Sequence, residues 1–419
     1  LYILKQALVW VLTAFWCYQF VISLCALVKL KDKPYLVNKN HKFMAIIPAH
    51  NEEMVVANLI ESLKNQIYDK NLYDIYVIAD NCTDKTAEVA RKAGAIVYER
   101  FDNAHKTKGY ALQWFLKQKI AENADYDAFF VFDADNIVDK NFIKNMNKKL
   151  CQGEEVVQGY RDIKNPTDNW ITAGYALFYW TMHRMYHLAR YNIGLSPLLN
   201  GTGFMVKFDV VKPNGWETQT LTEDIEFSLK QIIQGRKLGW ATDAIVYDEQ
   251  PEKFKASWTQ RTRWTVGHIQ CMKIYTKDLA KAVQKNKTIM NFDGLLYIVG
   301  SIPMFVLSIV LLLSNFVIYM LDTMTTAGLI LNILRYVVPT FFLPMLSAVF
   351  TMYLDKKPIK PMLKWLIYYP LFTGSWLLIN FKCLFKRETS WEKIEHKRSI
   401  KITDMNEENQ EEEKIVEKV

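Results

Sequence analysis

The sequence divides into long apolar segments and one long region in which apolar and polar positions alternate. Residues 7–28 carry no charged side chain, and a helix of about 20 apolar residues is long enough to cross a bilayer. Residues 295–320 have the same character, and 328–354 nearly so, with Arg335 as the one charge. A fourth segment, 362–382, is interrupted by charged and helix-breaking residues. The pattern predicts an integral membrane protein.

A cleaved signal peptide is the alternative interpretation of residues 7–28. The apolar stretch is longer than the roughly 7–15 residues of a signal peptide, and no small-residue cleavage site follows it. We therefore expect a membrane anchor. The sequence opens on Leu1 rather than Met, which leaves open residues, or even another span, in front of it.

Lysines indicate the orientation in the membrane. They cluster in residues 29–42 and 277–287, whereas the connection 321–328 between two apolar segments has no Lys or Arg. Because cytoplasmic flanks are enriched in these residues, we expect a multi-pass protein of the inner or plasma membrane with a cytoplasmic domain. If residues 362–382 also span the membrane, the basic tail 385–398 lies on the non-cytoplasmic side, against the tendency of basic segments to be cytoplasmic. The alternatives are that 362–382 is re-entrant or interfacial, or that one span has been miscounted.

The predicted organisation has four parts. They are a transmembrane helix (1–30), a cytoplasmic domain with interfacial helices (35–290), C-terminal transmembrane helices (291–385) and a cytoplasmic tail with a disordered end (386–419). The net charge of +8 comes mostly from the basic flanks, so it favours lipid headgroups or a phosphorylated substrate over nucleic acid. Six cysteines without metal-type spacing are typical of reduced thiols.

Within 35–290, short apolar strand patterns alternate with helix patterns. This order predicts an α/β domain with a parallel, doubly wound sheet. Polar residues follow the strands, where open α/β sheets bind ligands. The segments are 42–53, 73–94, 95–100, 106–120 and 126–138.

Asp133 and Asp135 lie two apart at the end of a predicted strand. Side chains at this spacing share a face. Two neighbouring carboxylates repel unless a cation neutralises them, so one interpretation is a divalent metal site that also holds a diphosphate. The alternative is a solvated turn.

Thr222, Glu223 and Asp224 precede an amphipathic helix pattern. A polar or acidic residue here can cap the helix. A carboxylate here can also act as a general base toward an attacking hydroxyl. Different residues of the triplet can serve both purposes.

Weaker signals lie elsewhere in this region. The glycine-rich segment 200–207 would allow either a close approach of the backbone to a ligand or a turn. Lys108 lies at the start of a predicted helix, where its ammonium group could bind an anionic partner or face solvent. The aromatic run 169–191 holds His183 and His187 four apart. Without a third ligand, packing at the membrane surface is favoured over zinc.

Four motifs occur in a fixed order, at 80–81 (DN), 133–135 (DAD), 222–224 (TED) and 260–264 (QRTRW). Together they resemble the family 2 glycosyltransferases, and most closely the membrane-embedded branch with cellulose, hyaluronan, chitin and poly-N-acetylglucosamine synthases. The resemblance covers nearly the whole chain. It implies a GT-A fold with Rossmann-like nucleotide-sugar binding, and a UDP-sugar donor, with UDP-GlcNAc or UDP-glucose first.

The resemblance also implies roles for residues. Asp135 would hold Mg²⁺ or Mn²⁺, Asp224 with Glu223 would provide the general base, and Gln260 would order the site. Acceptor contacts would come from Trp264, by stacking, and from Gly203 in the glycine-rich segment. The nucleotide-sugar contacts would be Ala49, His50, Asn51, Glu52, Asp80, Lys108, Asp133 and Arg263, the last of which stabilises the leaving diphosphate.

The sequence thus predicts an inverting, metal-dependent membrane enzyme that polymerises a UDP-sugar and extrudes the chain through its own spans. The sequence leaves open whether accessory membrane subunits take part. A single-transfer enzyme with a lipid acceptor and a non-catalytic scaffold are the alternatives. One departure concerns the tail, where Trp391 resembles the nucleotide-covering loop of chitin and hyaluronan synthases but is followed by Glu392-Lys393 instead of Gly-Thr.

Overall fold

The computed structural model describes residues 2–28, 33–320 and 325–385. They form two compact units. The sheet unit consists of the described residues of Leu30–Asn165 and Ser196–Pro251, and the helical unit of those of Leu1–Lys29, Pro166–Leu195 and Glu252–Thr389. The tail around Trp391 and its acidic end lie outside the described residues.

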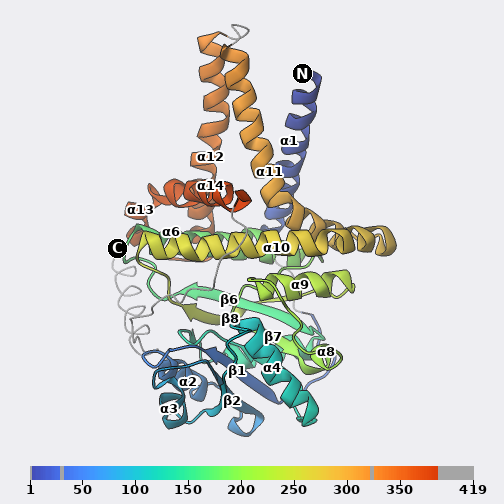
Figure 1. The fold of residues 1–419 in the computed structure, drawn as a ribbon, viewed down its shortest axis with the longest axis vertical. Helices are drawn as coiled ribbons and strands as arrows, with labels where there is room; N and C mark the ends of the chain where they lie inside the picture. The colour runs from blue at the N-terminus through green and yellow to red at the C-terminus, as the bar shows by residue number, and fades with distance from the viewer. Residues whose placement is uncertain (1, 29–32, 321–324, 386–419) are drawn as a thin grey trace. The chain divides into compact units, whose positions relative to one another are not determined.

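One eight-stranded sheet, in the order β3-β2-β1-β4-β7-β6-β8-β5, organises the sheet unit (Figure 1). Its strands are β1 (Phe43–Ala49), β2 (Tyr73–Asp80), β3 (Ile96–Arg100), β4 (Ala128–Val131), β5 (Ile137–Val138), β6 (Val156–Ile163), β7 (Phe204–Lys207) and β8 (Gly239–Asp248). The α/β domain of GT-A type expected from the sequence is confirmed.

The parallel pairing expected from the sequence holds for β1 to β4, whereas beyond β4 the sheet is mixed, with β6 and β8 parallel. Strands β1 to β4 pair in parallel, but β7 runs antiparallel to both β4 and β6, and β5 runs antiparallel to β8. Between β6 and β7 the chain passes through 166–195, which belongs to the helical unit. The connection is therefore not a βαβ crossover contained in the sheet unit, the arrangement that requires parallel strands.

Helices cover both faces of the parallel half of the sheet. On one face, alternate residues of β1 such as Phe43 and Ile47 are buried with α2 (Val56–Lys64), α3 (Thr86–Lys92) and α5 (Phe142–Cys151). Strand residues of the opposite parity face α4 (Lys108–Ala121), where the rings of Tyr76 and Phe115 lie 5.2 Å apart. Each such buried side chain contributes roughly 1.5–3 kcal/mol, and this packing fixes the carboxyl ends of β1, β2 and β4.

The remaining helices of the sheet unit are α8 (Phe208–Val211) and α9 (Glu223–Ile233). Trp216 holds α9 against the sheet: its ring is stacked on Phe227 of α9 at 4.0 Å and on Phe204 of β7 at 5.7 Å. Stacked rings gain roughly 0.5–1.5 kcal/mol beyond the buried area. The start of α9, which carries the TED motif, is therefore rigidly placed.

The helical unit contains α1 (Tyr2–Leu24), α6 (Trp170–Thr181), α7 (Ala189–Asn192), α10 (Phe254–Asn286), α11 (Ile289–Met320), α12 (Thr326–Leu354), α13 (Ile359–Leu366) and α14 (Tyr369–Phe385). A π-helical segment, Met182–Leu188, joins α6 to α7. The aromatic run 169–191 is mostly buried against α12, α13 and α14. It therefore packs on other helices of the protein more than on a surface.

Residues Gln6–Leu27, in α1 and the 3-10 turn Cys25–Leu27 that follows it, form a helix that is long and apolar enough to cross a membrane. A bent pair in α11, Ile289–Gly300 and Ile302–Leu311, makes a second candidate if it is one span. Large apolar side chains of α1 such as Trp10 and Phe20 are exposed, unlike those of a core helix. The 50° bend in α11 lies next to Pro303, which cannot donate a helical hydrogen bond.

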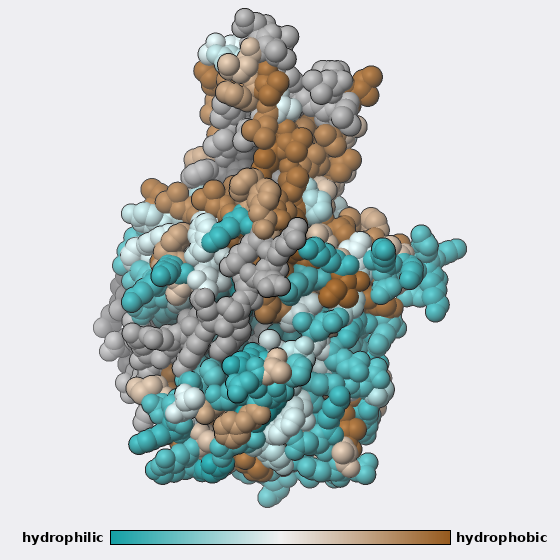
Figure 2. Space-filling view, in the orientation of Figure 1, coloured by the Kyte–Doolittle hydropathy of each residue, from teal (hydrophilic) through white to brown (hydrophobic). Residues whose placement is uncertain are grey.

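The described surface over α11 and α12 is largely apolar (Figure 2). The fourth apolar segment of the sequence forms two helices, α13 and α14, of 8 and 17 residues, each shorter than the roughly 20 residues of a straight span. The multi-pass topology stays a prediction.

Candidate active site

The loops after β1 and β2 lie side by side at the carboxyl edge of the sheet. Ala49 ends β1 and is buried. The next residue, His50, places its ring Nδ1 2.7 Å from the carbonyl oxygen of Asp80, at the end of β2. Asn51 turns the chain with a φ of 57°, a conformation that asparagine tolerates better than most residues. The amide of Glu52 donates to a threonine hydroxyl of α3 at 2.7 Å, so the two loops are joined.

Asp80 is held by donors on one side. Its Oδ1 accepts from Arg100 Nη1 at 2.6 Å and from Asn81 Nδ2 at 3.0 Å. Arg100 also donates through Nη2 to Asp102 at 2.9 Å. Burial raises the pKa of the Asp80 carboxyl, while the Arg100 guanidinium acts in the opposite direction. The carboxylate of Asp80, one of the predicted nucleotide-sugar contacts, is thus immobilised.

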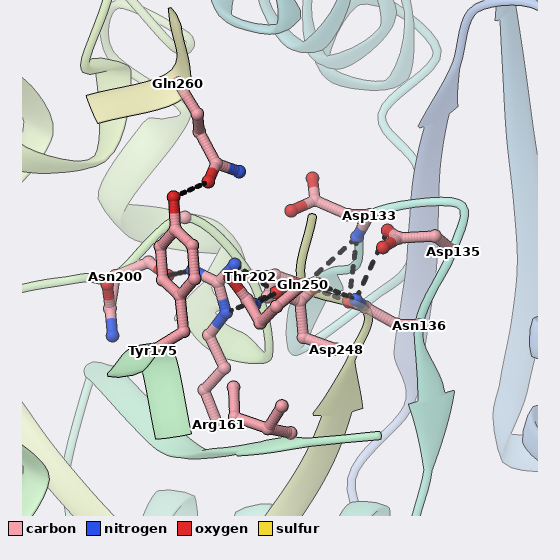
Figure 3. Close-up of polar contacts among 12 residues, drawn as sticks. Asp133, Asp135, Asn136, Arg161, Tyr175, Asn200, Thr202, Asp248, Gln250 and Gln260 are labelled. Atoms are coloured by element: carbon pink, nitrogen blue, oxygen red, sulfur yellow. Dashed lines mark hydrogen bonds and ion pairs between the residues drawn. The ribbon is translucent and has the colours of Figure 1, made fainter. Parts of the chain in front are cut away.

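Three carboxylates converge after β4 and β8. Asp133, Asp135 and Asp248 each offer an oxygen, and these oxygens lie within 4.8 Å of one another (Figure 3). Burial and the two neighbouring acids raise the pKa of Asp248 to about 6, against the effect of Arg161. Carboxylate oxygens grouped in this way are the donors that Mg²⁺ and Mn²⁺ prefer. The group can therefore hold a divalent ion.

Buried polar side chains fix this triad. Asn136 donates through Nδ2 to Asp248 at 2.9 Å, and its Oδ1 accepts from the backbone N–H of Asp133 at 3.1 Å. Arg161 donates through Nε to the other oxygen of Asp248 at 3.0 Å, as Figure 3 shows. Partners of this kind orient the ligands of a metal site.

Lys108 lies between the triad and the TED motif. Its Nζ donates to Asp133 at 2.5 Å and to the carbonyl oxygen of Gly201 at 2.6 Å, and it is 3.9 Å from Glu223 Oε1. Its approach to a diphosphate stays a prediction, but its position beside the triad puts a cation where that group would lie.

Glu223 and Asp224 open α9. Thr222 occupies the N-cap position, and its side chain makes no capping hydrogen bond. The preceding loop is held by the buried Glu226, whose Oε2 accepts the backbone N–H groups of residues 219 and 220 at 2.9 and 2.7 Å. The Thr222 side chain therefore does not cap α9, whereas the acids of the first turn, Glu223 and Asp224, interact with backbone N–H groups at the start of the helix.

Burial shifts the pKa of both acids of this pair upward. Burial, with a further contribution from Asp224, raises the pKa of Glu223 to about 7, and burial also raises the pKa of Asp224. Lys108 opposes both shifts. A carboxylate with a pKa near the working pH is suited to remove a proton from a hydroxyl.

The glycines of the segment 200–207 have different surroundings. A Cβ at Gly201 would stand 3.8 Å from Asp224 Oδ2 and 3.7 Å from Arg161 Nη1, whereas one at Gly203 would stand 2.3 Å from Val246 of β8. Both have a positive φ, 78° and 63°. Packing against β8 explains Gly203, whose contact with an acceptor stays a prediction.

The QRTRW residues lie on α10 in the helical unit. Gln260 Oε1 accepts from the hydroxyl of Tyr175 at 2.7 Å (Figure 3). The ring of Trp264 lies 6.1 Å from that of Tyr175 and 6.4 Å from those of Tyr179 and Trp376. Arg263 and Trp264 are partly exposed, and aromatic side chains of this kind suit a sugar face.

The structure thus brings most of the predicted residues together within the sheet unit, while Gln260, Arg263 and Trp264 form a second group within the helical unit. The sequence reasoning missed Asp248 and Arg161. Asp248 is the last residue of β8. An apolar strand pattern that ends in an acid, like the one that ends at 132–135, was the sequence signal that could have pointed to it.

Comparison with known proteins supports the fold and shows the family. The family described as "Glycosyltransferase like family 2" matches residues 41–267 of this 419-residue chain. The chain belongs to this family, whose members are transferases that use nucleotide sugars. The probable glycosyltransferase YdaM of Bacillus subtilis is 26% identical over 84% of this chain and 86% of its own length.

Of two further likenesses, one covers a shorter part of the chain and the other has a lower sequence identity. The β-monoglucosyldiacylglycerol synthase of Nostoc is 29% identical over 54% of this chain, and the match spans 48% of that relative. The mannosyltransferase PcManGT of Pyrobaculum calidifontis, solved with GDP-Man and Mn²⁺, has a similar fold, with a TM-score of 0.61, 14% identity, and coverage of 92% of this chain and 100% of that one.

Proposed function

We propose that this protein is an inverting, metal-dependent membrane glycosyltransferase that moves a sugar from a UDP-sugar to a growing polysaccharide. The observation that carries this proposal is the triad of Asp133, Asp135 and Asp248 beside the tuned pair Glu223 and Asp224. One group can hold the donor's metal, and the other can deprotonate the acceptor. A non-catalytic scaffold has no use for either.

The triad would hold Mg²⁺ or Mn²⁺, with Asp135 as a main ligand. A bound divalent ion supplies electrostatic stabilisation of the charge that develops on the leaving diphosphate. Lys108, already beside Asp133, adds a positive charge there, and Arg263 of the helical unit is the second predicted cation for the leaving group.

Asp224 would accept the proton of the acceptor hydroxyl as its oxygen attacks the anomeric carbon. The new bond forms on the face opposite the diphosphate, whose oxygen takes the electron pair of the breaking bond. Glu223 shares the buried charge of the site. Because this scheme uses one base and no enzyme nucleophile, the anomeric configuration inverts.

The pocket for the nucleotide would be the joined loops that hold Ala49, His50, Asn51 and Glu52, with Asp80 toward the base. UDP-GlcNAc and UDP-glucose are the first donors to test. The acceptor would meet Trp264 and the aromatic residues of α6, and the membrane-spanning helices would give the product its way out.

A single transfer to a lipid is the second candidate. The similarity to the Nostoc β-monoglucosyldiacylglycerol synthase favours it, as does the exposed apolar surface of the helical unit, which would place the enzyme beside lipid acceptors.

Product length separates the two candidates. Purified full-length protein in detergent would receive each UDP-sugar of a panel with Mn²⁺ and a lipid extract, with UDP release and product size as readouts. A ladder of long products supports the polysaccharide synthase. A product of one sugar on a lipid supports the second candidate, and no UDP release from any donor contradicts both.

A further inference from the structure

The two oxygens of the Asp80 carboxylate have unequal surroundings. Each carboxylate oxygen can accept about two hydrogen bonds. Oδ1 receives two, from Arg100 Nη1 at 2.6 Å and Asn81 Nδ2 at 3.0 Å. Among the described residues, no side chain donates to Oδ2. The carboxylate therefore offers a ligand one open oxygen, and its side chain is 11% exposed.

Several contacts hold this asymmetry in place. Arg100 is buried and is fixed at its other end by Asp102. Asn81 is fixed on both sides of its amide, because Nδ2 donates to the carbonyl of Asp102 at 3.2 Å and Oδ1 accepts from the N–H of Asp102 at 2.9 Å. The backbone of Asn81 has a φ of 52°, and the two hydrogen bonds between its side chain and the backbone of Asp102 help to hold this conformation. Rotating Asp80 to present both oxygens would break the contacts to Arg100 and Asn81.

The nucleobases differ in the number of adjacent N–H groups that they present. Uracil presents one N–H, at N3, between two carbonyl oxygens. Guanine presents two neighbouring N–H groups, N1–H and the exocyclic N2–H, which together match a carboxylate with both oxygens open. A single open oxygen pairs well with the one N–H of uracil, whereas the two parallel N–H groups of guanine must share it in poorly aligned hydrogen bonds, which costs binding free energy.

We propose that Arg100 and Asn81 are specificity-determining residues that, by occupying one oxygen of Asp80, select a base with one N–H, as in a UDP-sugar, against guanine. This inference rests on the proposed function, because it takes Asp80 as the residue that meets the base. Arg100 and Asn81 act by positioning and do not touch the substrate.

The test compares nucleoside diphosphates that differ by one group. IDP is GDP without the exocyclic amino group, so it presents a single N–H on a purine of the same size, and N3-methyl-UDP is UDP without its N–H. Binding to the full-length protein in detergent with Mn²⁺ would be measured by calorimetry. We expect IDP to bind about tenfold more tightly than GDP, which corresponds to about 1.4 kcal/mol, and UDP at least tenfold more tightly than N3-methyl-UDP.

Two substitutions free Oδ1, the occupied oxygen of Asp80. Asn81→Gly removes one donor and tolerates the positive φ, and combining it with Arg100→Met removes the charged donor without supplying an amide donor in its place. In the double variant we expect the preference for IDP over GDP to vanish or reverse. Arg91→Gln, which removes an exposed partner of Glu99, is the matched control and should leave the preference unchanged.

The outcomes distinguish the inference from the function on which it rests. Wild-type protein that binds GDP as tightly as IDP overturns the inference, and so does a folded double variant with an unchanged ratio. If the double variant does not fold, the wild-type comparisons of IDP with GDP and of UDP with N3-methyl-UDP decide alone. Folded wild-type protein that binds none of these nucleotides overturns the proposed function as well.

Discussion

The sheet unit and the helical unit both bury charged side chains, but in different proportions. In the sheet unit the acids of the triad and of the Glu223–Asp224 pair meet fewer cations, chiefly Lys108 and Arg161. At Arg190 and Asp293 of the helical unit, one buried acid meets one buried base. Arg190 donates to both oxygens of Asp293, at 2.9 and 3.1 Å.

This difference separates chemistry from architecture. A balanced, hydrogen-bonded pair such as Arg190 and Asp293 joins helices, here α7 to α11. The pair also binds α1, because Tyr18 donates to Asp293 at 3.0 Å and Arg190 donates to Gln19 at 2.8 Å. An excess of buried acid is costly by itself. This cost is offset when the carboxylates bind a metal ion or accept a proton from a substrate, the two roles that the proposed sugar transfer requires.

The largest effect is expected for Asp224→Asn. If Asp224 is the base, the rate of UDP release should fall about 1,000-fold, within the 10²–10⁴ typical of a general base, while donor binding changes little. Asp209→Asn, at an acid whose side chain is 57% exposed, is the control and should have no effect. Near-normal turnover in Asp224→Asn would remove it from the role of base.

Arg190→Met tests the architectural side of the comparison. Removing one partner of a buried pair leaves Asp293 uncompensated and should lower the free energy of unfolding by about 3–5 kcal/mol. A lower midpoint of thermal unfolding in detergent is the measurement, with UDP release by the folded fraction unchanged.

The double variant Arg190→Met, Asp293→Leu sharpens this result. With both charges gone, much of the lost stability should return. A double variant as unstable as the single one would show that size and shape at Arg190, and not the ion pair, hold the helices.

Asp248→Asn probes the residue that the sequence did not reveal. If Asp248 is a metal ligand, the Mn²⁺ concentration for half-maximal activity should rise at least about 10- to 100-fold, the range found even for partners of metal ligands. The measurement is a Mn²⁺ titration of UDP release at saturating donor. An unchanged Mn²⁺ dependence would limit the metal site to Asp133 and Asp135.

The smallest effect is expected in the pH profile of Lys108→Met. The base must be ionised, so the rate falls as the pH drops through its pKa. Lys108 lowers the pKa of Glu223 and of Asp224; removing its charge should move the acid limb of the profile to higher pH. Lys108→Arg keeps the charge and should leave the limb nearer its original position. A limb that moves to lower pH would contradict the assignment.

The sequence was informative where a pattern is local. Alternating strands and helices predicted β1 to β4 and the helices between them, and the short motifs located Asp80, Asp135 and Asp224. The antiparallel β7 and the triad's third member, Asp248, depend on contacts between distant segments, because Asp248 meets Asp133 only after β8 has joined the sheet beside β6. No short-range spacing encodes that meeting.

The central claim is that the triad makes sugar transfer depend on a divalent ion. The most direct measurement is UDP release from a UDP-sugar by wild-type protein and Asp135→Asn, each with Mn²⁺ and with EDTA. The account predicts rapid release only in wild-type protein with Mn²⁺ and slow release in the other three cases. Equal release by wild-type protein with Mn²⁺ and with EDTA would contradict it.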